Sequence, residues 1–194
     1  MHWLNIAKIL AATEAEGPGL RFVIWVQGCL KRCIGCCNGD LLKIKPVHIC
    51  RSNEIIMKLI ESKKQYPLEG LTFLGGEPML QADGLADIAE AAQNLGLSVI
   101  CFSGYQKYEL IEEQFIGSQR LLAATDLLIT GEFDQTKTET IRNWVGSTNQ
   151  QFHYLTDRYN VEIETRPLTV TNEWRINLDN KIVGNGLPFE ITMK

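Results

Sequence analysis

The sequence lacks long apolar runs. No segment approaches the ~18 consecutive apolar residues that a membrane-spanning helix needs. The stretch 1–19 carries glutamates and only a short apolar run, which does not fit a signal peptide. We therefore expect a cytoplasmic protein with no membrane partner. In that compartment cysteines stay reduced, and clustered thiols serve metal or redox chemistry more often than disulfides.

A surplus of positive charge is also missing. The 194 residues include 19 Lys and Arg against 23 Asp and Glu, for a formal net charge of −4. A nucleic-acid-binding protein usually has a basic face, so we expect no nucleic-acid partner. Repeats and Pro/Gly/Ser-rich linkers are absent as well, and this length predicts one domain over residues 1–194.

Strand and helix patterns alternate along most of the chain. Buried-strand runs lie at 21–26, 71–74, 97–105 and 126–133. Helical patterns lie at 52–64, with a cap candidate at Ser52, at 81–96, with a stop at Gly96, and at 108–114 and 118–124. This alternation predicts parallel β/α units. Four units are too few for a closed barrel of ~250 residues, so we expect an α/β fold with a partial, open TIM-like barrel, its core over about 17–150.

The tail has a different pattern. The segments 161–167 and 174–186 alternate apolar and polar residues, with a turn at Asp179-Asn180. We expect strands or a hairpin at the sheet edge, which form a short β-rich extension over about 160–194.

Four of the six cysteines lie within nine residues, directly after the first predicted strand. In the spacing Cys29-x3-Cys33-x2-Cys36, three thiolates can hold three irons of a [4Fe–4S] cluster and leave the fourth iron open to a small molecule. An open position is what separates a catalytic metal site from a structural one. We expect the adjacent Cys37 to point away from the cluster and Cys101 to lie in a buried strand.

A second interpretation of the cysteines is zinc. Cys33-x2-Cys36 followed by His48-x-Cys50 has the ligand types of a Cys3His site in a non-catalytic zinc or iron–sulfur binding module. The spacing of the cysteines alone does not choose between the two.

The second loop, "FLGGEPML", follows the next strand. Gly75 and Gly76 let a backbone approach a ligand closely, Glu77 supplies a carboxylate, and Pro78 fixes the turn. A strand-to-helix turn explains the same residues without a ligand. Ligands of parallel β/α folds bind where the strands end, and a second loop there, one β/α unit after the cysteines, favours a ligand site.

Together these two loops resemble the radical S-adenosylmethionine (radical SAM) superfamily. The resemblance implies that Cys29, Cys33 and Cys36 bind a [4Fe–4S] cluster whose open iron is chelated by the amine and carboxylate of S-adenosylmethionine. It also implies amine-side contacts from the second loop, namely Gly75, Gly76, Glu77 and Pro78. An external one-electron donor reduces the cluster, and reductive cleavage gives a 5′-deoxyadenosyl radical that abstracts a hydrogen atom from the substrate.

The chain is more closely similar to the small single-cluster branch of anaerobic ribonucleotide-reductase activating proteins and other glycyl-radical activases. The stretches that carry this similarity are "GPGLRFVIWVQGC", Gly35 before the third cysteine, "FSGY" and "DLLITGEF…WVGSTNQ". They spread over most of residues 17–150. The chain departs from the branch at Cys37, where a bulky residue is usual.

Ser103 and the segment 146–150, both near the expected site, can each be interpreted in two ways. Ser103, after the third strand, is either a ribose contact or a turn-forming serine. The polar segment 146–150 either contacts the cofactor or, as we expect, caps a helix that begins near Gln150.

The resemblance implies a peptide or protein substrate. One option is a glycine of a glycyl-radical enzyme. The other is a ribosomally made precursor peptide, modified with the help of an accessory, leader-binding partner protein. The sequence leaves both open. It has no second cysteine cluster, so we expect no auxiliary iron–sulfur centre.

Overall fold

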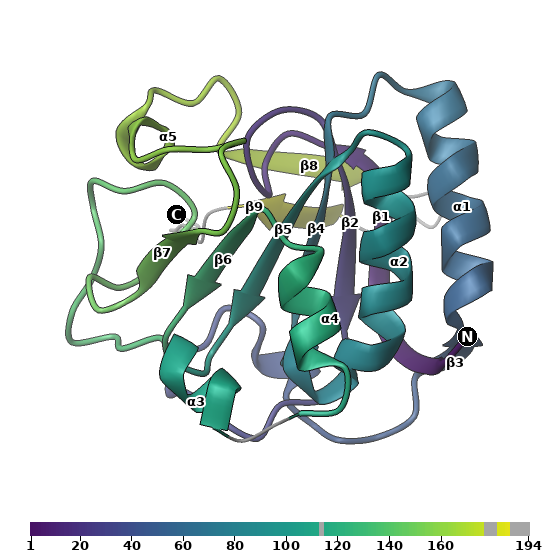
Figure 1. The fold of residues 1–194 in the computed structure, drawn as a ribbon. Coiled ribbons are helices and arrows are strands. Elements are labelled where there is room, and N and C mark those ends of the chain that lie inside the picture. Colours follow the sequence, from purple (N-terminus) through teal and green to yellow (C-terminus); the bar gives the residue numbers. More distant parts are fainter. Residues whose placement is uncertain (113–114, 177–181, 187–194) are drawn as a thin grey trace.

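A seven-stranded sheet with four parallel strands at its centre organises the chain (Figure 1). The computed structural model describes residues 1–112, 115–176 and 182–186. The order of strands in the sheet is β3-β1-β2-β4-β5-β6-β7. Their bounds are β1 Trp3–Thr13, β2 Arg21–Val26, β3 His48–Arg51, β4 Gly70–Gly75, β5 Ser98–Ser103, β6 Leu127–Thr130 and β7 Gln151–Tyr154. The strands β2, β4, β5 and β6 pair in parallel, while β1, β3 and β7 pair antiparallel.

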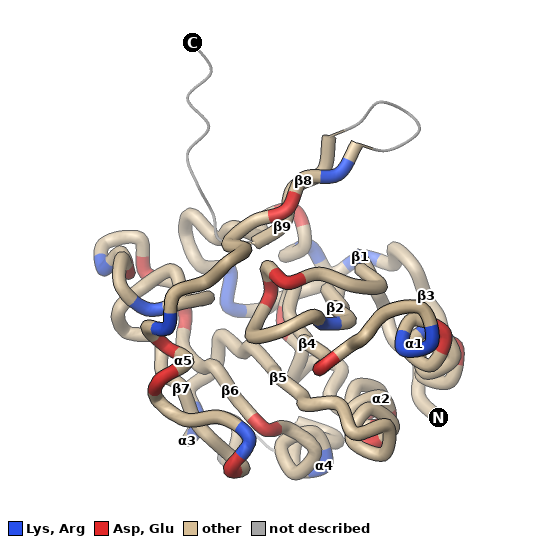
Figure 2. Tube along the Cα trace, turned by 90° about the horizontal axis from the view of Figure 1, so that it is seen from above, with Lys and Arg blue, Asp and Glu red and all other residues tan. Residues whose placement is uncertain are grey.

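Helices cover one face of this sheet, and a hairpin lies on the other side (Figures 1 and 2). The covering helices are α1 Ser52–Gln65, α2 Ala82–Asn94 and α4 Ser118–Ala123. The short elements are the 3-10 turns η1 Gly39–Leu41 and η2 Pro78–Gln81, the helices α3 Lys107–Glu112 and α5 Glu162–Thr165, and the hairpin strands β8 Asn172–Ile176 and β9 Ile182–Gly186. Among the described residues, no helix is long and apolar enough to span a membrane.

The central strand β2 is buried on both of its faces. Successive side chains of a strand point to opposite faces. Phe22 and Ile24 accordingly pack in the core under the helices, whereas Val23 and Trp25 pack with Leu74 on the other face. A strand covered on both faces has a continuous apolar sequence, which is why 21–26 shows no alternation.

The predicted mixed α/β architecture with parallel central strands is confirmed. Strand β2 has the predicted bounds, and β4 extends the predicted 71–74 by one residue at each end. Helix α2 ends before Gly96, whose φ of +78° suits glycine at a helix stop. The described strands form an open sheet rather than a closed barrel.

The prediction of the cap at Ser52 is wrong. Glu54 Oε1 instead accepts a hydrogen bond of 2.8 Å from the backbone amide of Arg51 at the start of α1. The Ser52 hydroxyl donates to Asp87 of α2 at 2.7 Å. The Ser52 hydroxyl therefore joins α1 to α2 instead of capping the amino end of α1.

The tail differs from its prediction in two respects. The segment 161–167 contains the helical turn α5 instead of a strand. The hairpin of β8 and β9 exists, but as a separate two-stranded sheet, because β3 and β7 occupy the edges of the main sheet. The predicted turn at 179–180 lies outside the described residues. Strands β1 and β3 had no prediction, and β3 pairs with β1, which is distant in the sequence.

Arg21, at the first residue of β2, is completely buried. Burial lowers the pKa of its guanidinium, while the Tyr159 hydroxyl beside it raises that pKa. The guanidinium donates hydrogen bonds to six acceptors: Thr72 Oγ1 (2.6 Å), Leu71 O (2.7 Å), Pro18 O (3.0 Å), Tyr159 OH (3.0 Å), Ser98 Oγ (3.1 Å) and Ser98 O (3.2 Å). One side chain thus ties β2, β4 and β5 to the segment that precedes α5.

Replacing Arg21 by Met should strongly destabilise the fold. The variant keeps most of the side-chain volume but leaves buried acceptors unpaired, which costs on the order of 3 kcal/mol of unfolding free energy. Tyr159→Phe, which removes only one hydroxyl from the same network, should cost about 1 kcal/mol. Urea denaturation followed by circular dichroism measures both. Equal losses for the two variants would contradict the central role of Arg21.

Candidate functional site

A cavity of about 290 Å³ lies at the carboxyl ends of the parallel strands, on the face away from the covering helices. Leu74 and Phe102, which belong to the apolar cluster of that face, form part of its lining. The loops that follow β2, β4, β5 and β6 all contribute residues to its walls. Its volume is close to the lower end of the ~300–1,000 Å³ that is usual for small-molecule sites.

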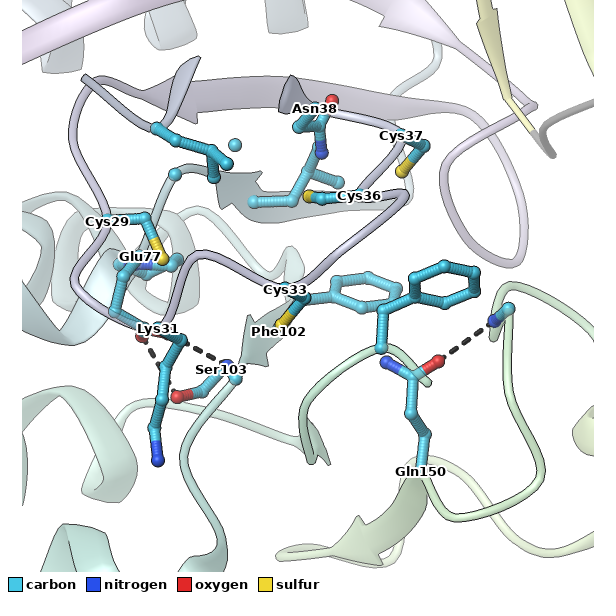
Figure 3. A pocket seen from close by; sticks show the side chains of 18 of the residues that line it. Cys29, Lys31, Cys33, Cys36, Cys37, Asn38, Glu77, Phe102, Ser103 and Gln150 are labelled. Carbon is cyan, nitrogen blue, oxygen red and sulfur yellow. Dashed lines mark hydrogen bonds between the residues drawn. The ribbon is translucent and has the colours of Figure 1, made fainter. Parts of the chain in front are cut away.

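The three predicted ligand cysteines line this cavity together (Figure 3). Cys29 is 5 % exposed, and Cys33 and Cys36 are half-buried. The loop leaves β2 with a hydrogen bond of 3.1 Å from the Cys29 amide to the Leu42 carbonyl oxygen. It turns sharply at Gly35, whose φ is +75°, and a Cβ there would lie 2.8 Å from Gln135 Oε1. The sequence therefore needs glycine before the third cysteine.

Cys37 also lines this cavity, beside Cys36 (Figure 3), and its orientation away from the cluster stays a prediction. A hydrogen bond between the two thiols lowers the pKa of Cys36 to about 6 and raises the pKa of Cys37.

The residues of the zinc interpretation are divided between two parts of the structure. Cys50, in β3, is 2 % exposed and packs in the core with Leu4 and Ile55, whereas Cys33 and Cys36 line the cavity. Within the described ranges, no group of three or more His, Cys, Asp and Glu side chains is arranged around a single metal ion. Cys101 is buried in β5, as predicted.

Gly75 and Gly76 allow the second loop to pack directly against the backbone that leads into Cys29. A Cβ on Gly75 would lie 2.5 Å from the Val26 amide nitrogen, and one on Gly76 would lie 2.2 Å from the Gly28 carbonyl oxygen. Any side chain at these two positions would push the loops apart. The glycine pair therefore fixes the spacing between the second loop and the cysteine loop.

Glu77 is a fully buried carboxylate beside the cavity. It accepts hydrogen bonds from the Met79 amide (3.0 Å), the Ser103 hydroxyl (2.9 Å) and the Gly104 amide (2.7 Å). Burial raises its pKa to about 7, although these three donors and the nearby Lys31 lower it. The carboxylate joins the loops after β4 and β5, and Pro78 begins η2 directly after it.

Ser103 lines the cavity, as do Gly146 and Gln150 of the polar segment 146–150, and their hydrogen bonds are made within the protein. The Ser103 hydroxyl donates to Glu77 and accepts from the Tyr105 amide at 3.1 Å. Gln150 Oε1 accepts from the Gly146 amide at 2.9 Å, and its Nε2 donates to the Gly131 carbonyl at 3.3 Å. Strand β7 begins at the next residue, so the prediction of a helix near Gln150 is wrong.

Two further residues of the cavity had no sequence prediction. Trp144 has a φ of +61°, which is unusual for a bulky residue, and its indole Nε1 is buried with no hydrogen-bond partner among the described residues. Glu16 accepts a hydrogen bond of 2.8 Å from the Gly186 amide, and burial raises its pKa to about 7. This bond brings the hairpin to one end of the cavity, through a contact across 170 positions of sequence that no local pattern indicates.

The donor set fits an iron–sulfur cluster with a bound small molecule. Three thiols come from one loop, one of them with a pKa near neutral, and they share a cavity with a buried carboxylate. Cysteine thiolates are the usual ligands of such clusters.

The chain is similar to known proteins over most of its length. Residues 15–153 match the family model described as the 4Fe-4S single cluster domain. The chain is 31% identical over 160 residues to the anaerobic ribonucleoside-triphosphate reductase-activating protein of Vibrio cholerae, which covers 79% of this chain and 99% of that protein. It is 32% identical over 122 residues to the pyruvate formate-lyase-activating enzyme of Listeria monocytogenes, which covers 59% of this chain and 47% of that enzyme.

Among solved structures, QueE from Escherichia coli aligns with a TM-score of 0.41 at 18% identity, over 53% of each chain. The chain thus spans nearly the whole of the Vibrio relative and less than half of the Listeria enzyme.

The pKa of Glu77 predicts a pH dependence of stability. A carboxyl group whose pKa rises from 4.5 to about 7 on folding stabilises the fold below pH 4.5, and this contribution is lost as the pH rises through 7. Glu77→Gln should remove about 3 kcal/mol of that fall in unfolding free energy. Urea denaturation of the metal-free protein at several pH values measures it. Glu16→Gln removes a second buried carboxyl group whose pKa is raised to about 7 and should remove a comparable part of the fall. An undiminished fall in both variants would contradict the assignment.

Proposed function

Since the chain belongs to the radical S-adenosylmethionine superfamily, we propose that it abstracts a hydrogen atom from a main-chain glycine of a partner protein. The chain is an enzyme of this superfamily, and its cofactors are a [4Fe–4S] cluster and S-adenosylmethionine. When bound, these cofactors supply a 5′-deoxyadenosyl radical by one-electron reductive cleavage. The electron comes from an external donor.

Cys29, Cys33 and Cys36 hold the cluster in this proposal. Their shared position on the cavity supports the assignment. Cys37 lies on the same cavity and is left as a spare thiol.

The second loop, with Gly75, Gly76, Glu77 and Pro78, forms the amine side of the S-adenosylmethionine site. Burial disfavours the ionised form of Glu77, and a cation beside a buried carboxylate stabilises that form. The ammonium group of the cofactor is such a cation. Ser103 acts through Glu77, to which its hydroxyl donates, and so serves as a positioning residue of the cofactor site.

The proposed substrate class rests on the similarity to a reductase-activating protein. This similarity extends over 99% of that protein's length. The cavity supports it, because about 290 Å³ accommodates little beyond one small ligand. The bulk of a protein substrate then stays outside, and only a thin segment such as a glycine reaches the cavity. Leu30 and Ile34, in the cysteine loop, are 55% and 77% exposed, which suits contact with a macromolecule.

A series of cysteine variants tests the cluster assignment. After anaerobic reconstitution, the unaltered protein should bind four irons and cleave S-adenosylmethionine on reduction. Cys29→Ala, Cys33→Ala and Cys36→Ala should each lose the cluster and the cleavage. Cys37→Ala and Cys50→Ala are the matched controls and should keep both. Loss of the cluster in Cys37→Ala, with retention in Cys36→Ala, would contradict the proposed ligand set.

Isotope transfer tests the substrate. A glycyl-radical enzyme from the same genome, labelled with deuterated glycine, should transfer deuterium into 5′-deoxyadenosine and acquire a glycyl radical detectable by electron paramagnetic resonance (EPR). The control is the same enzyme with alanine at the target glycine, which should do neither. Deuterium transfer from a short precursor peptide held by a leader-binding protein, and not from the large enzyme, would refute glycine activation.

A further inference from the structure

The cysteine loop has few backbone anchors between its first two cysteines. The Cys29 amide bonds to Leu42 at one end, and the Cys36 amide bonds to the Cys33 carbonyl at 3.3 Å further along. In the part of the chain that the structure describes, residues 30–32 make no backbone hydrogen bond. Leu30 is exposed, and Arg32 adopts a φ of +55°. Something other than backbone pairing must therefore hold this arc in place.

Lys31 is the side chain that connects the arc to the protein. Its Nζ lies 2.8 Å from Glu109 Oε1 in α3 and 3.2 Å from Glu132 Oε1 after β6. The ammonium also lies 4.3 Å from the centroid of the Tyr105 ring, a cation–π contact. The Lys31 side chain is only 15 % exposed, so its ion pairs are less screened by solvent than ordinary surface pairs.

The two glutamates that pair with Lys31 are themselves held by hydrogen bonds, near the ends of the neighbouring strands β5 and β6. Glu109 Oε2 accepts a hydrogen bond of 2.5 Å from the Gln106 amide at the start of α3. Glu132 Oε2 accepts a long hydrogen bond of 3.8 Å from the Cys33 thiol, and the Glu132 carbonyl accepts one of 2.8 Å from Asn149. One ammonium thus joins the loops that follow β2, β5 and β6.

The stem of Lys31 also contacts the loop that supports Glu77. A Cβ on Gly104 would lie 3.3 Å from Lys31 Cγ and 3.4 Å from Glu77 Oε2. The Gly104 amide is one of the donors to Glu77. In Figure 3 the Lys31 side chain runs from the cysteine loop past Glu77 and Ser103, with its ammonium directed away from the cysteine sulfurs. The side chain therefore brings the arc between Cys29 and Cys33 against the loop after β5 that supports Glu77, beyond the contact at Gly28 that the glycine pair holds.

We propose that Lys31 is a positioning residue which, through Glu109 and Glu132, holds the arc between Cys29 and Cys33 at a fixed distance from the Glu77 loop. The inference rests on the proposed function, since it gives the arc the task of placing the cluster beside S-adenosylmethionine. Lys31 lines the cavity, and its ammonium is directed away from the cysteine sulfurs. Its loss leaves two carboxylates facing each other at the rim with no cation between them.

The test compares Lys31→Met with Arg32→Met. Both variants remove one positive charge from the same loop, but the Arg32 side chain is exposed and makes no ion pair or hydrogen bond within the described residues. In the metal-free protein, hydrogen exchange at the Cys29 and Cys36 amides, whose hydrogen bonds flank the arc, should become roughly fivefold faster in Lys31→Met and stay unchanged in Arg32→Met. This readout needs neither cluster nor activity.

In the reconstituted protein, the same pair should differ in how the cluster responds to its ligand. Lys31→Met should bind four irons, bind S-adenosylmethionine roughly fivefold more weakly, and show a smaller change in the EPR spectrum of the reduced cluster on binding. Lys31→Arg should restore most of both properties. Glu109→Gln should weaken binding in the unaltered protein and add little in the Lys31→Met background, because the two residues act together.

Equal behaviour of Lys31→Met and Arg32→Met in exchange and in S-adenosylmethionine binding would overturn the proposal. The proposal would also be overturned if Glu109→Gln weakened S-adenosylmethionine binding as much in the Lys31→Met background as in the unaltered protein. These outcomes are distinct from a failure of the proposed function, which would appear as an unaltered protein that binds no cluster or leaves S-adenosylmethionine intact.

Discussion

Two backbone hydrogen bonds between neighbouring strand ends determine the geometry of the candidate site. The Gly76 amide donates to the Val26 carbonyl and the Glu77 amide donates to the Gly28 carbonyl, both at 2.8 Å. These bonds continue the parallel pairing of β2 and β4 beyond the sheet and into the loops. They exist only because glycines at 75 and 76 leave room for the backbone of the other loop. The cysteines and the buried carboxylate therefore come to the same cavity as a consequence of strand pairing.

The rest of the fold keeps these strand ends in register. At the amino ends of the parallel strands, the buried guanidinium of Arg21 joins β2, β4 and β5. At the carboxyl ends, Glu77 joins the loops after β4 and β5, and Lys31 joins the loops after β2, β5 and β6. The contacts of Arg21 and Glu77 are buried, where unpaired groups are costly, and those of Lys31 are partly exposed. A rigid sheet held at both ends suits chemistry in which a reactive cofactor must stay in a fixed position.

The parts that the sequence predicts are those with local patterns. Continuous apolar runs identify β2 and β4, and the spacing of Cys29, Cys33 and Cys36 identifies the metal-binding loop. The parts that it does not predict depend on distant partners. Strand β3 is an edge strand of four residues that pairs with β1, and Glu16 meets Gly186 across most of the chain. The place of Cys37 on the cavity, beside Cys36, depends in the same way on an irregular loop, whose course no local pattern predicts.

Mössbauer spectroscopy of the ⁵⁷Fe-reconstituted protein tests the central claim most directly, since it distinguishes the iron sites of one cluster. Three sulfur-bound irons and one open iron predict that S-adenosylmethionine changes the signal of one iron in four and leaves the other three as they were. A spectrum in which all four irons respond alike, or in which none responds, would contradict a cluster held by three cysteines with one position open to the cofactor.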